Sequence, residues 1–175
     1  MTVAIRPAKA SDIAAITRIY AHAVEHSSSS FELTPPDQAE MALRMDGLVS
    51  KGFPYLAAEV EGVLAGYAYA GLYRTRPAYR FTLEDSVYIA PDMHRRGVGR
   101  ALLVALIDTS EARGFRQMTA VIGDSPRQAG SIGLHEAVGF QRVGVLQDVG
   151  YKFGGWRDTL LMQRALGAGA ATAPR

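Results

Sequence analysis

One segment of the chain, residues 84–103, joins a carboxylate, an apolar strand, a basic turn with glycines and a helix, in the order EDSVYIAPDMHRRGVGRALL. The first amides of a helix have no partners within the helix, and the helix dipole favours negative charge there. Glycines let the backbone approach a ligand, and arginines add forked, charge-assisted hydrogen bonds. The segment therefore predicts a site for a phosphate or pyrophosphate. Its expected residues are His94, Arg95, Arg96, Gly97, Val98, Gly99 and Arg100.

Glu84 lies on the strand that leads into this turn and is a candidate general base. On a regular strand it shares one face with Thr82 and Ser86, whereas Asp85 points to the opposite face. An α-amine with a pKa of about 8 is mostly protonated at neutral pH, so its use as a nucleophile requires a base. The alternative reading of Glu84 is a carboxylate on a solvated strand face.

Other features of the sequence exclude several classes of function. The turn has neither the G-x-G-x-x-G of dinucleotide sites nor the Gly-Lys-Ser/Thr of triphosphate loops, which argues against hydride and phosphoryl transfer. With no cysteine, the chain has no disulfide, no thiolate nucleophile and no Cys-ligated metal, and we expect no metal site. A net charge of +2 is too small to indicate nucleic acid or an anionic membrane as the main partner. No apolar run is long enough for a membrane span or signal region, so the cytoplasm is the expected location.

The pattern along the chain predicts the element order β-α-α-β-β-β-α-β-α-β-β, a mixed α/β sheet with helices on its faces. Ser11 and Asp12 are expected to cap the first helix and Asp37 the second. Residues 1–166 are expected to form one domain, and 167–175, rich in glycine and alanine, a disordered tail. The expected strands are 3–6, 55–60, 63–72, 80–89, 118–122, 140–146 and 156–162, and the later helices are 97–113 and 129–138.

At these motifs the chain resembles the GNAT superfamily of N-acetyltransferases, whose coenzyme A loop reads Q/R-x-x-G-x-G/A. It is similar in particular to the group that acetylates phosphinothricin and methionine sulfoximine. The similarity covers about residues 3–166, with His94 and Gln128 where relatives commonly have Gln or Arg and Asn, respectively. The segments that carry it read IRPA, AGYAYAG, TLEDSVYIAP, SIGLHEAVGFQRVG and VGYKFGGWRD.

The resemblance implies the GNAT fold, acetyl-CoA as cofactor and a homodimer. It implies that Glu84 is the catalytic base and that His135 is a general acid or a cofactor contact; a buried structural histidine is the third reading. It also implies that the loop at residues 73–80 forms a wall of the substrate site, although an arginine-rich loop is most often only solvated. Further expected cofactor contacts are the backbone of Val87, Tyr88 and Ile89, with Gln128 and Ser131, and the expected substrate contacts are Phe31, Arg74, Arg76, Tyr79 and Arg80.

The implied reaction is direct attack of an α-amine on acetyl-CoA in a ternary complex, with a small amino acid analogue such as phosphinothricin, methionine sulfoximine or methionine sulfone as acceptor. Without cysteine, no cysteine acyl-enzyme can form. Two alternatives remain open. One is acetyl transfer to another amine, such as a polyamine, an aminoglycoside or a protein N-terminus. The other is a non-catalytic sensor that binds acyl-CoA.

Overall fold

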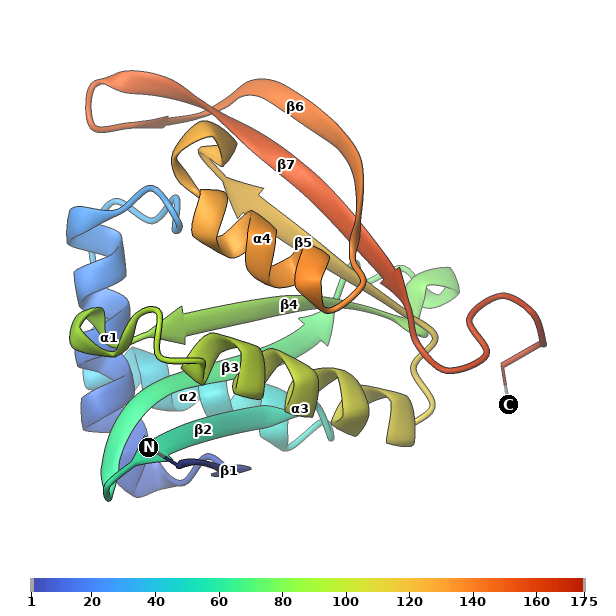
Figure 1. Ribbon diagram of the computed structural model, residues 1–175, viewed down its shortest axis with the longest axis horizontal. Coiled ribbons are helices and arrows are strands. Elements are labelled where there is room, and N and C mark those ends of the chain that lie inside the picture. The colour runs from blue at the N-terminus through green and yellow to red at the C-terminus, as the bar shows by residue number, and fades with distance from the viewer. Residues whose placement is uncertain (1, 175) are drawn as a thin grey trace.

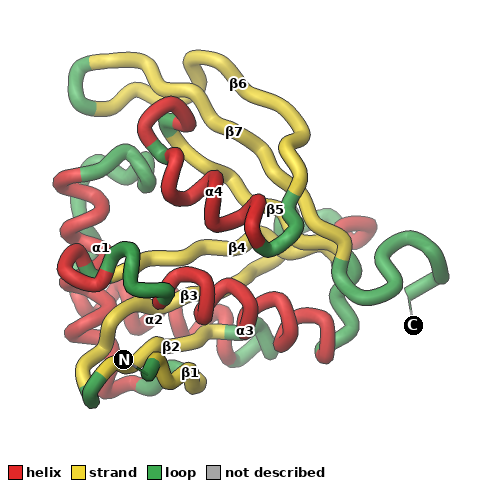
Figure 2. The backbone as a smooth tube through the Cα atoms, in the orientation of Figure 1, coloured by secondary structure: helices red, strands yellow, loops and turns green. Residues whose placement is uncertain are grey.

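The computed structural model describes residues 2–174 and contains one seven-stranded mixed sheet with helices on both faces (Figures 1 and 2). The strand order across the sheet is β1-β2-β3-β4-β5-β7-β6. The helices are α1 (Ile13–His26), α2 (Gln38–Val49), α3 (Val98–Ala112) and α4 (Ala129–Ala137). The strands are β1 (Val3–Pro7), β2 (Tyr55–Val60), β3 (Val63–Leu72), β4 (Thr82–Ile89), β5 (Gln117–Gly123), β6 (Gln141–Lys152) and β7 (Gly155–Ala165).

Turn and cap residues explain most of these boundaries. Glu61 and Gly62 both have positive φ, 52° and 78°, which is the geometry of a tight hairpin between β2 and β3. The carboxylate of Asp37 accepts a hydrogen bond from the amide of Glu40 at 2.8 Å and caps α2, as predicted. Asp12 occupies the predicted N-cap position of α1, but its carboxylate makes no capping hydrogen bond to that helix. It accepts from the amide of Lys9 at 2.7 Å and pairs with the guanidinium of Arg6 at 2.7 and 2.9 Å.

The sheet has a separate hydrophobic core on each face. On one face α3 contributes Leu102, Leu103 and Leu106, all fully buried, and packs mainly on β2, β3 and β4. On the other face α1 and α2 cover a layer of tyrosines from β2, β3 and β4, with Ile16 and Tyr67 fully buried. The sheet is therefore covered on both sides, and the site residues are positioned by both layers.

The two central strands separate along their length. β4 and β5 are parallel and pair only at the start, from Thr82 with Gln117 to Glu84 with Thr119. Beyond Glu84, β4 remains paired with β3 and β5 with β7, and the two strands diverge (Figure 1). The splayed site expected between parallel strands thus begins directly after Glu84.

The last two strands are longer than predicted and form an edge hairpin. The predicted strand at 140–146 extends to Lys152 because it continues to pair with β7 after an irregular stretch between Leu146 and Gly150. Beyond β7, the guanidinium of Arg116 donates to the carbonyl of Thr172 at 2.9 Å. The division into a domain at 1–166 and a disordered tail at 167–175 stays a prediction, and residue 175 lies outside the described part. No helix among residues 2–174 is long and apolar enough to cross a membrane.

Candidate active site

A narrow pocket of about 70 Å³ lies where β4 and β5 diverge. Its walls come from residues 85–88 of β4, residues 120–123 of β5 and the start of α4, and Ser29 closes it from the loop after α1. Because β5 no longer pairs with this part of β4, the backbone of Val87, Tyr88 and Ile89 has an open edge toward the pocket. An extended ligand can bind such an edge as an added strand. This geometry agrees with the predicted role of the three residues.

Glu84 stands at the base of this splay, on the α1/α2 face of the sheet. Leu83 and Asp85 point to the opposite face and are buried there, as strand alternation predicts. Burial raises the pKa of the half-buried Glu84 carboxyl, the neighbouring Asp85 raises it further, and Arg74 lowers it. A carboxylate with a raised pKa is better matched to accepting a proton near neutral pH.

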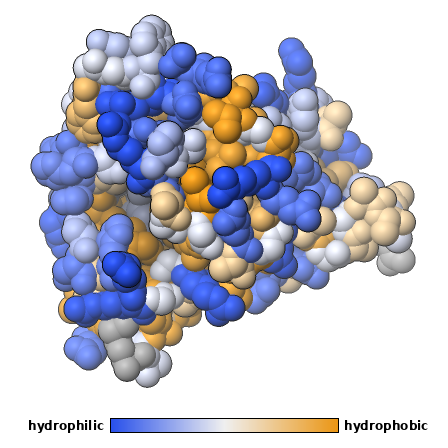
Figure 3. Space-filling model, turned by 45° about the horizontal axis from the view of Figure 1, so that its top comes forward, coloured by the Kyte–Doolittle hydropathy of each residue, from blue (hydrophilic) through white to orange (hydrophobic). Residues whose placement is uncertain are grey.

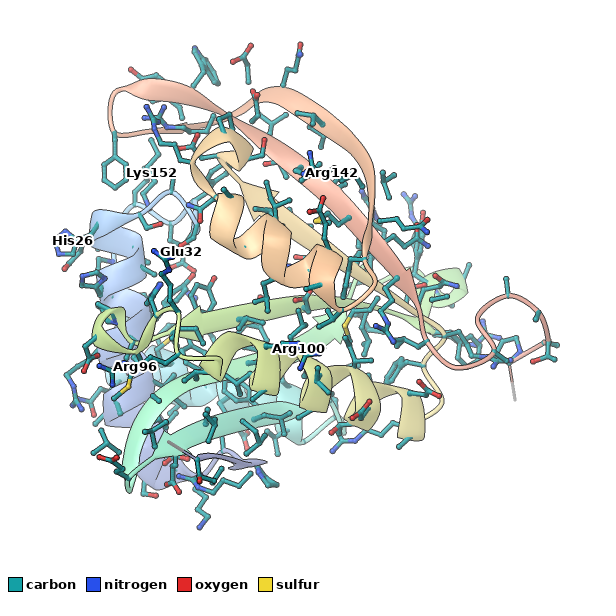
Figure 4. The ribbon with its side chains drawn as sticks, viewed as in Figure 1. His26, Glu32, Arg96, Arg100, Arg142 and Lys152 are labelled. Carbon is teal, nitrogen blue, oxygen red and sulfur yellow. The ribbon has the colours of Figure 1, made fainter. Side chains whose placement is uncertain are left out.

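The turn before α3 has the geometry of an anion site. Arg95 and Gly97 have positive φ, 60° and 80°, and the helix begins at Val98, whose amide and the next two have no acceptor within the helix. Arg96 and Arg100 lie exposed at this end of α3 (Figure 4). Gly99 was expected to let a ligand approach the backbone, but its position gives it a different role. A Cβ at Gly99 would lie 3.2 Å from the side chain of Leu134, so this glycine lets α3 pack closely against α4.

His94 has a contact that the sequence did not suggest. Its Nε2 lies 3.2 Å from the carbonyl oxygen of Ile89, so the side chain ties the turn back to the end of β4. The ring is exposed, and the interaction stabilises the turn through the strand that precedes it. The predicted contact of His94 with the cofactor stays a prediction.

His135 is 4 % exposed, and both of its ring nitrogens have partners. Nδ1 lies 2.7 Å from the carbonyl oxygen of Ser131, to which it donates, and Nε2 lies 3.0 Å from Oδ2 of Asp85. Burial lowers the pKa of His135, but the hydrogen bond and charge of Asp85 and the Ser131 carbonyl outweigh it, and the net shift is upward. The structure therefore favours an anchored, buried histidine at the pocket wall. Ser131 and Gln128, the other two predicted contacts on α4, also line the pocket.

Lys152, which the resemblance places with Trp156 in the dimer or pocket wall, supports the loop after α1. It is 3 % exposed, and its Nζ donates to the carbonyls of Ser27 and Ser30 at 2.9 and 2.6 Å. Figure 4 shows it reaching from the β6–β7 hairpin toward the loop that carries Glu32. The same loop is held by Asp124, whose Oδ2 accepts from the hydroxyl of Ser28 at 2.5 Å. No local pattern in the sequence pairs this lysine with the four serines before residue 31.

Phe31 packs against two glycines at the outer end of the pocket. A Cβ built on Gly123 would lie 2.7 Å from the ring, and one on Gly150 would lie 2.3 Å from it. Both values are below any normal carbon–carbon contact, so the ring occupies the space that two side chains would otherwise fill. Phe31 itself is half-buried.

The loop at residues 73–80, which carries Arg74, Arg76 and Arg80, lies at the opposite end of β4 from Phe31. Phe31 sits beside Gly123, four residues beyond the β5 partner of Glu84, which corresponds to about 13 Å along the strand. Within one chain, Phe31 and the loop at 73–80 therefore lie apart along β4 and β5, and their predicted contacts with the substrate stay a prediction. Arg74 is close enough to Glu84 for its charge to affect the pKa of that carboxyl. The other predicted residues are exposed: Arg76 is in the loop, Tyr79 packs on Tyr73 and Arg80 lies over the ring of Phe81.

Comparison with known proteins identifies the family. Residues 5–161 match the acetyltransferase (GNAT) domain. The chain is 55 % identical to a phosphinothricin N-acetyltransferase of Alcaligenes faecalis, over 97 % of this chain and 86 % of that protein. It is 38 % identical to an L-methionine sulfoximine/L-methionine sulfone acetyltransferase of Pseudomonas paraeruginosa, over 93 % and 94 %.

Among solved structures, the fold matches a GNAT superfamily phosphinothricin acetyltransferase from Sinorhizobium meliloti in complex with AcCoA. The TM-score is 0.97 at 46 % identity, covering all of this chain and 94 % of that one. These matches confirm the fold and the enzyme class expected from the sequence, and the chain belongs to the GNAT family of acetyltransferases.

Proposed function

We propose that the protein transfers the acetyl group of acetyl-CoA to the α-amine of phosphinothricin or a closely related analogue, such as methionine sulfoximine or methionine sulfone. The observation that carries the proposal is the 55 % identity to a phosphinothricin N-acetyltransferase over nearly the whole chain. The site supports it with a helix start suited to a pyrophosphate, an open strand edge suited to a pantetheine arm, and a carboxyl of raised pKa at the base of the splay. Because acetyl-CoA is made and used inside cells, the expected location is the cytoplasm.

In a direct transfer, different residues of the chain bind the cofactor and hold it in place. The free amides at the start of α3, with Arg95, Arg96 and Arg100 nearby, bind the pyrophosphate of the cofactor. The edge of β4 holds the extended arm, so the thioester lies in the pocket between β4 and β5. Holding both reactants in one site supplies much of the rate.

Glu84 accepts the proton of the acceptor amine, directly or through one water, and the neutral amine attacks the thioester carbonyl. Arg74, next in reach of Glu84, is placed to bind the acceptor carboxylate by a forked ion pair. The leaving thiolate needs little assistance, since a thiol has a pKa of about 8.5. His135 acts mainly by fixing the wall of the pocket, because both of its nitrogens are occupied.

A second copy of the chain is the proposed partner, through the β6–β7 hairpin. β6 is an edge strand whose side chains are exposed from Gln141 to Val149. Tyr151 and Trp156, 60 % and 62 % exposed, pack edge to face with ring centroids 5.3 Å apart. Figure 3, in which the top of the Figure 1 view comes forward, shows hydrophobic residues bordered by hydrophilic ones. Exposed apolar patches on an edge strand are typical of protein interfaces.

The test is an assay of free-thiol release from acetyl-CoA against a panel of amines at fixed enzyme concentration. We expect phosphinothricin, methionine sulfoximine and methionine sulfone to give the highest kcat/KM, and mass spectrometry to find one added acetyl group on the α-amine. A higher kcat/KM with a polyamine, an aminoglycoside or an N-terminal peptide would show that the substrate belongs to that class instead. Binding of acetyl-CoA without turnover of any amine would support the non-catalytic sensor instead.

A further inference from the structure

The pocket between β4 and β5 begins one residue beyond Glu84. Its wall on the β4 side is formed by residues 85–88. An amine that attacks a thioester in this pocket is therefore placed farther along β4 than the carboxylate that takes its proton. A general base acts within hydrogen-bond reach of the proton or through one bridging group. The offset along β4 thus calls for a polar group between the pocket and Glu84.

Ser86 is the pocket residue next to Glu84 on the same face of β4. Successive side chains of a strand alternate, so Glu84 and Ser86 project to the α1/α2 side of the sheet. Asp85 projects to the other side, where it binds His135. Residues two apart on a strand are separated by about 6.8 Å, which a glutamate carboxylate and a serine hydroxyl can largely bridge. Ser86 is half-buried and lines the pocket, so its hydroxyl is open to a ligand.

The neighbouring strand β3 supports the hydroxyl of Ser86. Tyr69 is the direct cross-strand partner of Ser86, and the two side chains are hydrogen-bonded. Burial raises the pKa of Tyr69, the hydrogen bond of Ser86 lowers it, and the net shift is upward, so the phenol keeps its proton at neutral pH. A serine oxygen has two acceptor sites and one proton. When Tyr69 donates to that oxygen, Ser86 can still accept one further proton donor and donate its own proton.

The other serines of the pocket are placed differently. Ser29 comes from the loop after α1, and its hydroxyl accepts from that of Ser27 at 3.1 Å. Ser131 belongs to α4, which packs with α3 on the face of the sheet opposite to Glu84. Ser86 is therefore the pocket hydroxyl that lies on the strand and the face of the base.

We propose that Ser86 relays the proton of the acceptor amine to Glu84. The amine donates its proton to Oγ of Ser86, while the Ser86 hydroxyl passes its own proton to the carboxylate. One proton leaves the nitrogen, one reaches Glu84 and the serine is unchanged. The lone pair set free on the nitrogen forms the bond to the thioester carbonyl carbon, and the C–S bond breaks to release the thiolate. This inference rests on the proposed acetyl transfer and gives Ser86 the place that one water would otherwise take.

The experiment compares Ser86→Ala with Thr82→Val. Thr82 shares the face of Glu84 at the same spacing but on the side away from the pocket, so it is the matched control. Ser86→Ala should lower kcat/KM for phosphinothricin by about 10- to 100-fold at pH 7, and by less at high pH, where the amine is neutral without help. Its KM for acetyl-CoA should stay within about twofold of the parent. Thr82→Val should keep the parental kinetics, and Ser86→Thr, which retains a hydroxyl, should stay within about threefold.

A relay also predicts that Ser86 and Glu84 do not act independently. In a Glu84→Gln background, Ser86→Ala should lower kcat/KM by no more than about a further twofold, because the group that receives the proton is already gone. A serine that only supports the strand would cost the same factor in both backgrounds and at every pH. Independent losses, with the Tm of each variant close to that of its background, would therefore overturn the relay.

The remaining outcomes separate this inference from the proposed function. If the parent protein acetylates phosphinothricin and Ser86→Ala is fully active at pH 7, the relay is overturned and the acetyl transfer stands. The relay is also overturned if Thr82→Val loses as much activity as Ser86→Ala, or if the KM of acetyl-CoA rises by the factor that kcat/KM falls. If the parent acetylates none of the amino acids in the panel, the proposed function itself fails, and that result is visible before any variant is made.

Discussion

His135 of α4 and Asp85 of β4 form a buried pair at the wall of the pocket between β4 and β5, with Nε2 and Oδ2 3.0 Å apart. The pair leaves Oδ1 of Asp85 buried without a hydrogen-bond partner among the described residues. A single proton between ring and carboxyl is enough to hold both groups, since Nδ1 already donates to Ser131. The pair therefore fixes α4 to the strand that bears Glu84.

Replacing Asp85 by Asn should destabilise the protein by about 3 kcal/mol, because one partner of a buried ionic pair is left uncompensated. The pKa of His135 is raised in the folded state, so the pair's stabilisation is complete below the unfolded pKa of about 6.5 and is lost as the pH rises through the folded value. Urea unfolding at several pH values from 5 to 9 measures this. The parent should lose stability across that range, and Asp85→Asn should not show this component. Equal pH dependence in both proteins would contradict the assignment.

Replacing Glu84 by Gln should lower kcat/KM for the acceptor amine by about 10²- to 10⁴-fold near neutral pH, since it removes the base. Activity should recover partly at high pH, where the amine loses its proton without help. In the parent, the acidic limb of the kcat/KM profile should lie above the ordinary pKa of a glutamate, because burial and Asp85 raise the pKa of Glu84. The KM for acetyl-CoA serves as the control. A variant with parental activity at pH 7 would remove Glu84 from the mechanism.

Replacing Arg74 by Gln should shift the acidic limb of the kcat/KM profile in a direction that the structure predicts. The charge of Arg74 lowers the pKa of Glu84, so its removal should move the acidic limb to higher pH. It should also raise the KM of an acceptor that carries a carboxylate. Arg76→Gln, an exposed arginine in the same loop, tests whether general loss of positive charge has the same effect. An unchanged limb in Arg74→Gln would show that the two groups do not interact in solution.

Replacing Lys152 by Met should loosen the loop at 27–31. The change leaves the carbonyls of Ser27 and Ser30 without their donor, at a cost of about 1–3 kcal/mol for each group that stays buried. Hydrogen exchange of the loop amides should speed up, and kcat/KM should fall because Ser29 closes the pocket from this loop. Lys152→Gln, which keeps a donor, should lose less than Lys152→Met. Lys9→Met, at an exposed lysine, is the control. Unchanged exchange in Lys152→Met would refute the positioning role.

Local patterns predicted the elements well. The turn at Glu61 and Gly62, the cap at Asp37 and the helix start after Gly97 each follow from a few neighbouring residues, and all three lie where expected. Asp12 lies at the predicted start of α1 but does not cap it, because its carboxylate binds Arg6 of β1 and the amide of Lys9. The length of β6 was underestimated because its continuation depends on pairing with β7.

The site was predictable where it follows one strand and one helix, as from Glu84 to Arg100. It was not predictable where distant segments meet. The contacts of Lys152 with Ser27 and Ser30 and of His135 with Asp85 span 122–125 and 50 residues of sequence, respectively.

The ring of Phe31 determines the order in which its neighbouring residues in this enzyme can be substituted. Because Gly123 and Gly150 both give their side-chain space to that ring, neither can accept even an alanine while the phenylalanine stays in place. Substitution of Phe31 can come first, since a smaller residue at 31 leaves an empty space beside the two glycines. Natural drift and laboratory selection are thus expected to change residue 31 before Gly150, whereas Gly123 stays restricted, because the backbone carbonyl of Ser28 would lie 2.8 Å from a Cβ there.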